Sequence, residues 1–129
     1  MGKILRDLWI LTQDGLTIFN RVINPNLGPQ MFGGLMSALN TFAESLSDGG
    51  MSNFELSRIR FTIEKKNHFI FVANSSSEVK PKKVMNELKR ISNKFFKVYP
   101  EEVIKNWSKD MKVFANFKEY IIDSLEKIE

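Results

Sequence analysis

The chain has 129 residues and no cysteine, and its 19 Lys and Arg residues outnumber its 15 Asp and Glu residues. The length predicts one domain over residues 1–129, with a core large enough to need no covalent cross-link. The lack of cysteine excludes disulfides, iron–sulfur clusters and thiolate zinc sites, and it favours a reducing, cytoplasmic compartment.

The positive charge is local. Residues 65–97 carry nine Lys and Arg against Glu78 and Glu87, a net charge of +7, whereas residues 1–64 and 98–129 carry −1 and −2. No window is apolar over the length needed to cross a bilayer, so any membrane contact is expected to be peripheral.

Two β-rich runs begin the chain, over residues 4–12 and 16–23. Gln13-Asp14-Gly15 separates them, and an Asp-Gly step between two such runs is a strong hairpin signal. Two prolines and a glycine in residues 24–29 then break regular structure.

A helix is predicted over residues 30–47, ended by Asp48-Gly49-Gly50. Its apolar residues recur at alternating three- and four-residue steps, and this stripe is expected to face the core: Phe32, Leu35, Leu39, Phe42 and Leu46, widened by Met31, Met36 and Ala43. Gly33 and Gly34 lie inside this helix, where each costs about 1 kcal/mol relative to alanine. Either the packing tolerates them, or another backbone, from the sheet or from a partner, approaches there.

Three short strands are predicted near residues 53–57, 59–66 and 68–74, with Lys66-Asn67 as the turn between the last two. A second helix is predicted over 81–97, with Val84, Leu88, Ile91 and Phe95 facing inward. A short helix over 101–109 precedes a final helix that Asp110 caps. The inward residues of the final helix are expected to be Met111, Phe114, Phe117, Ile121 and Leu125.

The apolar pattern of the strands predicts their order. Residues 8–11 and 69–72 are apolar at successive positions, so both faces of these two strands are expected to be buried, whereas the strands near 54 and 61 alternate. Strands buried on both faces belong in the centre of a sheet. This predicts an α/β fold of the α+β sandwich kind, with a five-stranded, mostly antiparallel sheet of order 2-1-5-4-3. One long helix covers one face, and two to three C-terminal helices cover the other.

This order of elements resembles the longin fold over nearly the whole chain. The hairpin LWILTQDGLTIFNR, the helix QMFGGLMSALNTFAESL and the strands RFTIEKKNHFIFVANSS carry the resemblance. The segment VIKNWSKDMKVFANFKEYIIDSL is similar to the end of small adaptor-type or stand-alone archaeal longin domains. The resemblance implies a scaffold or adaptor in vesicle trafficking or small-GTPase regulation, acting through dimers or larger assemblies. No heptad SNARE segment follows, so a SNARE is not expected. The roadblock and profilin folds share much of this layout, and the sequence leaves the subtype open.

No catalytic, cofactor-binding or metal-binding residue is predicted. His68, the only histidine, lies at a predicted turn and is interpreted as a solvated turn residue rather than a base or a pH sensor. The pairs Gly33-Gly34 and Gly49-Gly50 lack the spacing of a phosphate-binding loop, and no set of carboxylates clusters for a metal. We therefore expect that the protein is not an enzyme.

Seven basic residues are candidates for a charged surface: Lys65, Lys66, Lys82, Lys83, Arg90, Lys94 and Lys97. Four of them share the face of the second helix opposite its apolar stripe, and Lys65, Lys66 and Lys82 extend that patch. This is either an ordinary solvated helix face or a surface for an anionic membrane or an acidic protein. Nucleic acid is not expected, because no aromatic side chains interleave with these charges.

The third strand is expected at the margin of the sheet, where unpaired backbone groups accept a partner strand. Longin-type domains commonly use this edge and the adjacent helix, which by resemblance implicates Met36, Phe54, Leu56 and Ile59; the alternative is that these are core residues. The sequence thus predicts a non-catalytic protein-binding scaffold whose partners are a small GTPase or other longin or roadblock subunits. The alternatives are a peripheral membrane or polyanion binder acting through the basic second helix, and a profilin-like actin-binding protein.

Overall fold

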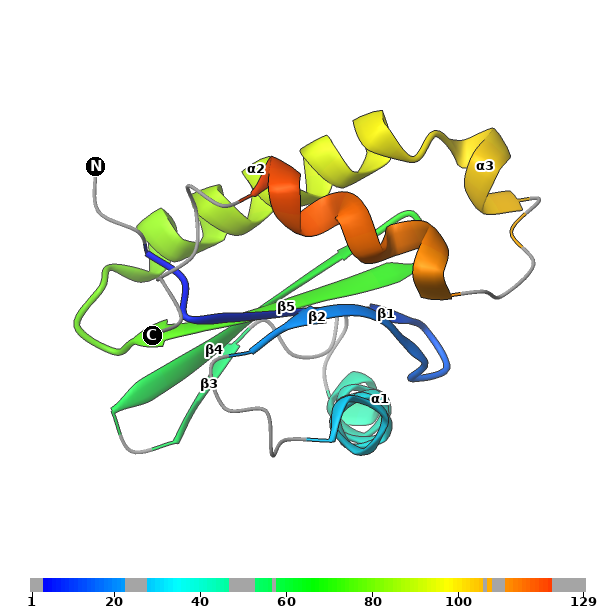
Figure 1. The fold of residues 1–129 in the computed structure, drawn as a ribbon. Helices are drawn as coiled ribbons and strands as arrows, with labels where there is room; N and C mark the ends of the chain where they lie inside the picture. Colours follow the sequence, from blue (N-terminus) through cyan, green and yellow to red (C-terminus); the bar gives the residue numbers. More distant parts are fainter. Residues whose placement is uncertain are drawn as a thin grey trace.

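In a computed structural model of the protein, a five-stranded sheet lies between helices on its two faces (Figure 1). The structure describes residues 4–22, 28–46, 53–56, 58–105, 107 and 111–121. The strands are β1 (Asp7–Thr12), β2 (Thr17–Arg21), β3 (Asn53–Leu56), β4 (Ile59–Lys66) and β5 (Phe69–Ser76). The helices are α1 (Pro29–Leu46), α2 (Pro81–Val98), α3 (Glu101–Lys105) and the 3-10 helix η1 (Met111–Tyr120).

The strand order is β2-β1-β5-β4-β3, and every neighbouring pair is antiparallel. This confirms the predicted order and fold class. Strand β1 is buried from Asp7 to Leu11, and β5 is buried from Phe69 to Ser75, so the two strands with apolar residues at successive positions do lie in the centre.

The alternation of side chains along β1 divides the core into two layers. Leu8 and Ile10 belong to a cluster with the buried residues of α2 and η1, and Trp9 and Leu11 belong to a second cluster with Met36 of α1. Figure 1 shows this layering, with α1 on one side of the sheet and α2 and η1 on the other. The larger cluster is built around Phe95, whose ring contacts Phe71, Phe114 and Phe117.

The β4–β5 turn and the end of α3 differ from the sequence-based expectation. The turn between β4 and β5 is Asn67-His68 and not Lys66-Asn67, because Lys66 pairs with Phe69 and leaves a two-residue loop. Both loop residues have positive φ, 50° and 69°, as tight antiparallel hairpins require. Helix α3 ends at Lys105 rather than at residue 109.

The final helix is a 3-10 helix, and its inward residues Phe114, Phe117 and Ile121 are fully buried as predicted. The three-residue step from Phe114 to Phe117 matches the three residues per turn of such a helix. Asp110, Leu125 and the side chain of Met111 lie outside the described part of the chain.

Candidate protein-binding surface

The outward face of α1 is apolar. Leu35, Leu39 and Leu46 expose 56%, 36% and 73% of their surface, and they recur at a spacing that places them on one side of the helix. Glu44 is the only charged residue in the 18 residues of α1. A helix with a row of exposed leucines and a single charged residue is typical of one that a partner covers. A helix that stays in contact with water normally carries more charged side chains.

This face corrects the sequence-based expectation, which placed Leu35, Leu39 and Leu46 toward the core. The side of α1 that meets the sheet carries Gly33, Met36 and Asn40, which are buried. Helix α1 therefore has apolar residues both on the side that meets the sheet and among its exposed residues. Gly33 fixes this orientation through its contact with the β1–β2 turn, and no pattern in the sequence distinguishes it from the adjacent Gly34.

The two adjacent glycines of α1 have different surroundings. A Cβ atom added to Gly33 would overlap the carbonyl oxygen of Gly15 and lie 2.6 Å from Thr17 Oγ1. Gly15 itself has a φ of 93° in the β1–β2 turn, so the hairpin and the helix meet backbone to backbone. A Cβ atom added to Gly34 would meet nothing within 4 Å. The sheet thus explains Gly33, whereas nothing in the described part of this chain requires a glycine at position 34.

The two edges of the sheet differ in whether a side chain is seen to bond their backbone groups. At the β2 edge, the side-chain amide of Gln30 accepts a hydrogen bond from Thr17 N (3.0 Å) and donates one to Thr17 O (2.9 Å), in the manner of a neighbouring strand. Strand β3 forms the opposite edge and pairs only with β4 among the described strands. An edge with backbone groups facing outward can accept a strand from another chain.

A row of stacked aromatic rings runs from α1 toward β3. Phe32 of α1 stacks on Trp9, with 4.0 Å between ring centroids, and Trp9 lies 6.0 Å from Phe61. Phe61 in turn stacks on Phe54 of β3 at 4.7 Å, with the rings parallel to within 1°. Trp9 and Phe61 are buried and Phe32 and Phe54 are partly buried, so this row runs through the core layer between α1 and the free edge of β3.

The four residues predicted for partner binding separate into two groups. Phe54 and Ile59 are partly exposed at the β3–β4 margin, and Leu56 ends β3, where it pairs with Ile59. Met36 does not belong with them, because it exposes 2% of its surface and packs in the cluster between α1 and the sheet. Sequence reasoning assigned Leu35, Leu39 and Leu46 of α1 to the core, and it left open whether a backbone from the sheet or from a partner approaches Gly34. We define the α1/β3 surface as Gly34, Leu35, Leu39 and Leu46 together with Phe54, Ile59 and the backbone edge of β3.

The seven basic candidates do not form one patch. Lys65 points to the α1 side of the sheet, where it pairs with Glu44 at 3.2 Å, so it does not extend the face of α2. Arg90 pairs with Glu87 at 2.8 Å, Lys94 donates to the Tyr120 carbonyl at 3.3 Å, and Lys66 donates to Asn93. Lys82, Lys83 and Lys97 are exposed on α2. Contacts with the chain itself therefore engage several charges of the predicted polyanion surface.

His68 lies exposed in the β4–β5 turn, where the sequence placed it. In the part of the chain that the structure describes, no three His, Asp or Glu side chains cluster so that they could hold a metal ion. Within the same part, no helix is long and apolar enough to span a membrane.

Comparisons with known proteins support the fold. No protein-family model and no curated protein sequence matches the chain. Among solved structures, it is similar to a roadblock/LC7 domain from Streptomyces avermitilis, with a TM-score of 0.58, 15% identity, and 74% of this chain and 85% of that chain covered. It is also similar to Myxococcus xanthus MglB, with a TM-score of 0.60, 13% identity, and 74% and 83% covered. An MglB with a tetrameric arrangement gives a TM-score of 0.51 at 14% identity, with 67% and 71% covered. The chain therefore has the longin-like fold in the form seen in roadblock and MglB proteins.

Proposed function

We propose that this protein is a non-catalytic, protein-binding domain that assembles with a second copy of itself through the α1/β3 surface and regulates a small GTPase. The observation that carries the proposal is the outward face of α1. Three exposed leucines, and a glycine that contacts within the described residues do not require, lie on a helix that is almost free of charge.

The chemistry of this face favours a second copy as the occupant. An apolar, nearly uncharged helix is complementary to itself, and a two-fold axis brings the same patch of both subunits together. Gly34 permits two helices to approach closely, and each leucine buried in such a contact contributes on the order of 1–2 kcal/mol. The edge of β3 lies at the end of the same aromatic row, so one partner copy can occupy both the helix face and the free edge.

Regulation of a small GTPase is the function that the longin resemblance implies. This role is also compatible with the fold, which offers binding surfaces. Among the described residues, we find no arrangement of catalytic groups. The tetrameric arrangement of one MglB shows that a protein with this fold forms assemblies, and it supports an oligomeric state here. We propose that assembly through the α1/β3 surface leaves the α2 side of the sheet available for the GTPase.

Size-exclusion chromatography with light scattering tests the assembly. Leu35→Asp places a charge in the middle of the α1/β3 surface and is expected to convert the assembled protein to a monomer. Val103→Asp is the matched control, because Val103 is a similarly exposed apolar residue on α3, away from this surface. A wild-type protein that stays monomeric at high concentration, or equal effects of the two variants, would contradict the proposal.

Binding of a GTPase is tested separately, with purified small GTPases loaded with GTP or GDP and titrated into the assembled protein. We expect binding that depends on the nucleotide state. If no small GTPase binds while Leu35→Asp still breaks the assembly, the regulatory role is wrong and the assembly surface stands.

A further inference from the structure

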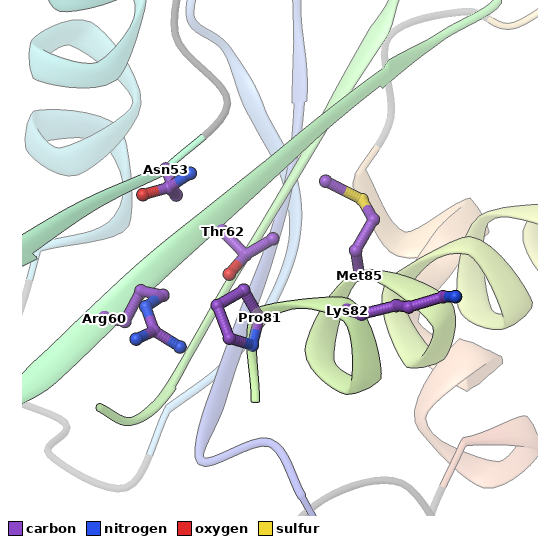
Figure 2. Close-up of a pocket in the computed structure, with 6 residues that line it drawn as sticks. All are labelled: Asn53, Arg60, Thr62, Pro81, Lys82 and Met85. Carbon is purple, nitrogen blue, oxygen red and sulfur yellow. The ribbon is translucent and has the colours of Figure 1, made fainter. Parts of the chain in front are cut away.

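A depression of about 240 Å³ lies at the N-terminus of α2, over the part of β3 and β4 that this helix leaves uncovered. Figure 2 shows the residues that line it: Asn53, Arg60, Thr62, Pro81, Lys82 and Met85. Asn53 and Thr62 are opposite each other across the β3–β4 pair, and Arg60 lies two residues from Thr62 on the same face. The floor of the depression is therefore polar and the wall is the first turn of α2.

The first turn of α2 carries uncompensated positive charge. Lys80 precedes the helix and makes no side-chain cap, Pro81 follows it, and the turn contains no acidic residue. The backbone amides of Lys83 and Val84 both bond the Lys80 carbonyl, and the partial positive charge of an 18-residue helix is concentrated at this end. A negative group placed here is stabilised by the helix and by Lys82 at the rim.

Arg60 adds a second cation and fixes the geometry. Its guanidinium donates to the carbonyls of Val79 (2.7 Å) and Ser77 (3.1 Å), which ties the β5–α2 connection to β4. Glu55 pairs with Arg60 at 3.3 Å. With Lys82, the depression keeps a net positive charge after this pairing.

The hydroxyl of Thr62 is the observation that points to a ligand. Thr62 exposes only 3% of its surface, and its Oγ1 atom has no hydrogen-bond partner in the described structure. In Figure 2 this oxygen points toward the space between Arg60 and Pro81. Ser75, which is opposite Arg60 on β5, also has a buried hydroxyl oxygen without a partner. Two orphaned hydroxyls beside a cation are costly to bury unless an acceptor reaches them.

We propose that this depression binds the phosphate group of a phosphomonoester. The group would accept a hydrogen bond from the Thr62 hydroxyl, and its charge would be balanced by the helix N-terminus, Arg60 and Lys82. The site differs from the polyanion surface predicted from the sequence, because it uses Lys82 and excludes the neighbouring Lys83, which the depression does not contact.

Titration with inorganic phosphate tests the proposal. The amide resonances of residues 60–62 and 82–85 are monitored by NMR at constant ionic strength, and chloride serves as the reference anion. We expect saturable shifts confined to these residues. Lys82→Gln should weaken phosphate binding by about threefold to fivefold. Lys83→Gln is the matched control, since it removes the same charge from the same helix turn and should leave binding unchanged. Thr62→Val should weaken binding by about tenfold without lowering the stability of the protein in chloride, because the lost hydroxyl has no partner to lose.

Vesicles of phosphatidylcholine with and without a phosphatidylinositol monophosphate identify the source of the phosphate. Sedimentation that depends on the phosphorylated lipid and on Lys82 assigns a lipid headgroup, and phosphate shifts without sedimentation assign a soluble phosphomonoester. Shifts that chloride reproduces, or that Lys82→Gln and Lys83→Gln weaken equally, would overturn the proposal.

Discussion

The two adjacent glycines of α1 give a sharp test of how this helix is oriented. Gly33→Ala and Gly34→Ala make the same chemical change at neighbouring positions of one helix, so helix propensity favours both variants by about 1 kcal/mol. At position 34 that gain is expected in full, because an added Cβ meets nothing within 4 Å. At position 33 the added Cβ overlaps the Gly15 carbonyl oxygen and crowds Thr17 Oγ1, so α1 must move away from the hairpin.

Overpacking of this kind costs about 1–3 kcal/mol, and a backbone neighbour relaxes less than a flexible side chain does. We therefore expect Gly33→Ala to lose about 1–2 kcal/mol net, which leaves a gap of about 2–3 kcal/mol between the variants. Because about 1 kcal/mol shifts the Tm of a domain of this size by roughly 3–5 °C, the gap is about 6–15 °C.

Urea unfolding followed by tryptophan fluorescence measures the free energy of unfolding of both variants. The measurement is made at low protein concentration, so that assembly does not add to the apparent stability. If Gly33→Ala is as stable as Gly34→Ala, the close contact between α1 and the hairpin is wrong, and with it the assignment of Leu35 and Leu39 to the outward face.

Three further predictions concern contacts that the sequence did not reveal. Gln30→Ala removes the amide that covers the β2 edge at Thr17 and should lower the free energy of unfolding by about 1 kcal/mol. The variant should also aggregate faster in light scattering, and an aggregation rate equal to that of the wild type would argue against the edge-covering role. Asn74→Ala takes away the Nδ2 donor that lies 3.0 Å from the buried Asp7 carboxylate and should cost about 2 kcal/mol in urea unfolding, whereas Asn93→Ala, on the exposed face of α2, should cost little. Burial, and secondarily the charge of Tyr120, raise the pKa of the Tyr99 phenol above its ordinary value of 10.0. Since the neutral phenol is the form favoured in the folded protein, its contribution to stability is full below pH 10.0 and is lost as the pH rises through the folded pKa. Absorbance at alkaline pH should show a tyrosine ionisation step above pH 10.0, and Tyr99→Phe should remove it; a step that persists in Tyr99→Phe would contradict the assignment.

The strand order of the sheet could be predicted because it depends on the apolar pattern within short segments of the sequence. Continuous apolar runs at residues 8–11 and 69–72 require cover on both faces, and that requirement alone places β1 and β5 in the centre. The hairpin at Asp14-Gly15 and the inward residues of the last two long helices follow from turn chemistry and periodicity. The structure confirms the hairpin, the inward residues of α2, and Phe114, Phe117 and Ile121 at the end of the chain that it describes.

The orientation of α1 could be predicted only in part, because its apolar residues cover more of the helix than the side that meets the sheet. Periodicity assigns Leu35 and Leu39 to the core together with Met36, but of these three only Met36 is buried, and the contact between Gly33 and Gly15 shows how the helix is turned. The side of the sheet to which Lys65 points depends on the register of β4, which a shift of one residue would reverse. The depression at the start of α2 is lined by residues of β3, β4 and α2, which lie far apart in the sequence, so no local sequence pattern predicts it.

The most direct test of the α1/β3 surface is amide hydrogen exchange as a function of protein concentration. If a second copy covers this surface, exchange in residues 34–46 and 53–56 should slow as the concentration rises, because assembly protects the outward face of α1 and pairs the free edge of β3. Residues 17–21 of β2, whose edge Gln30 already covers at Thr17, should exchange at the same rate at every concentration. Exchange of residues 53–56 that is independent of concentration, in a protein that light scattering shows to be assembled, would contradict the account.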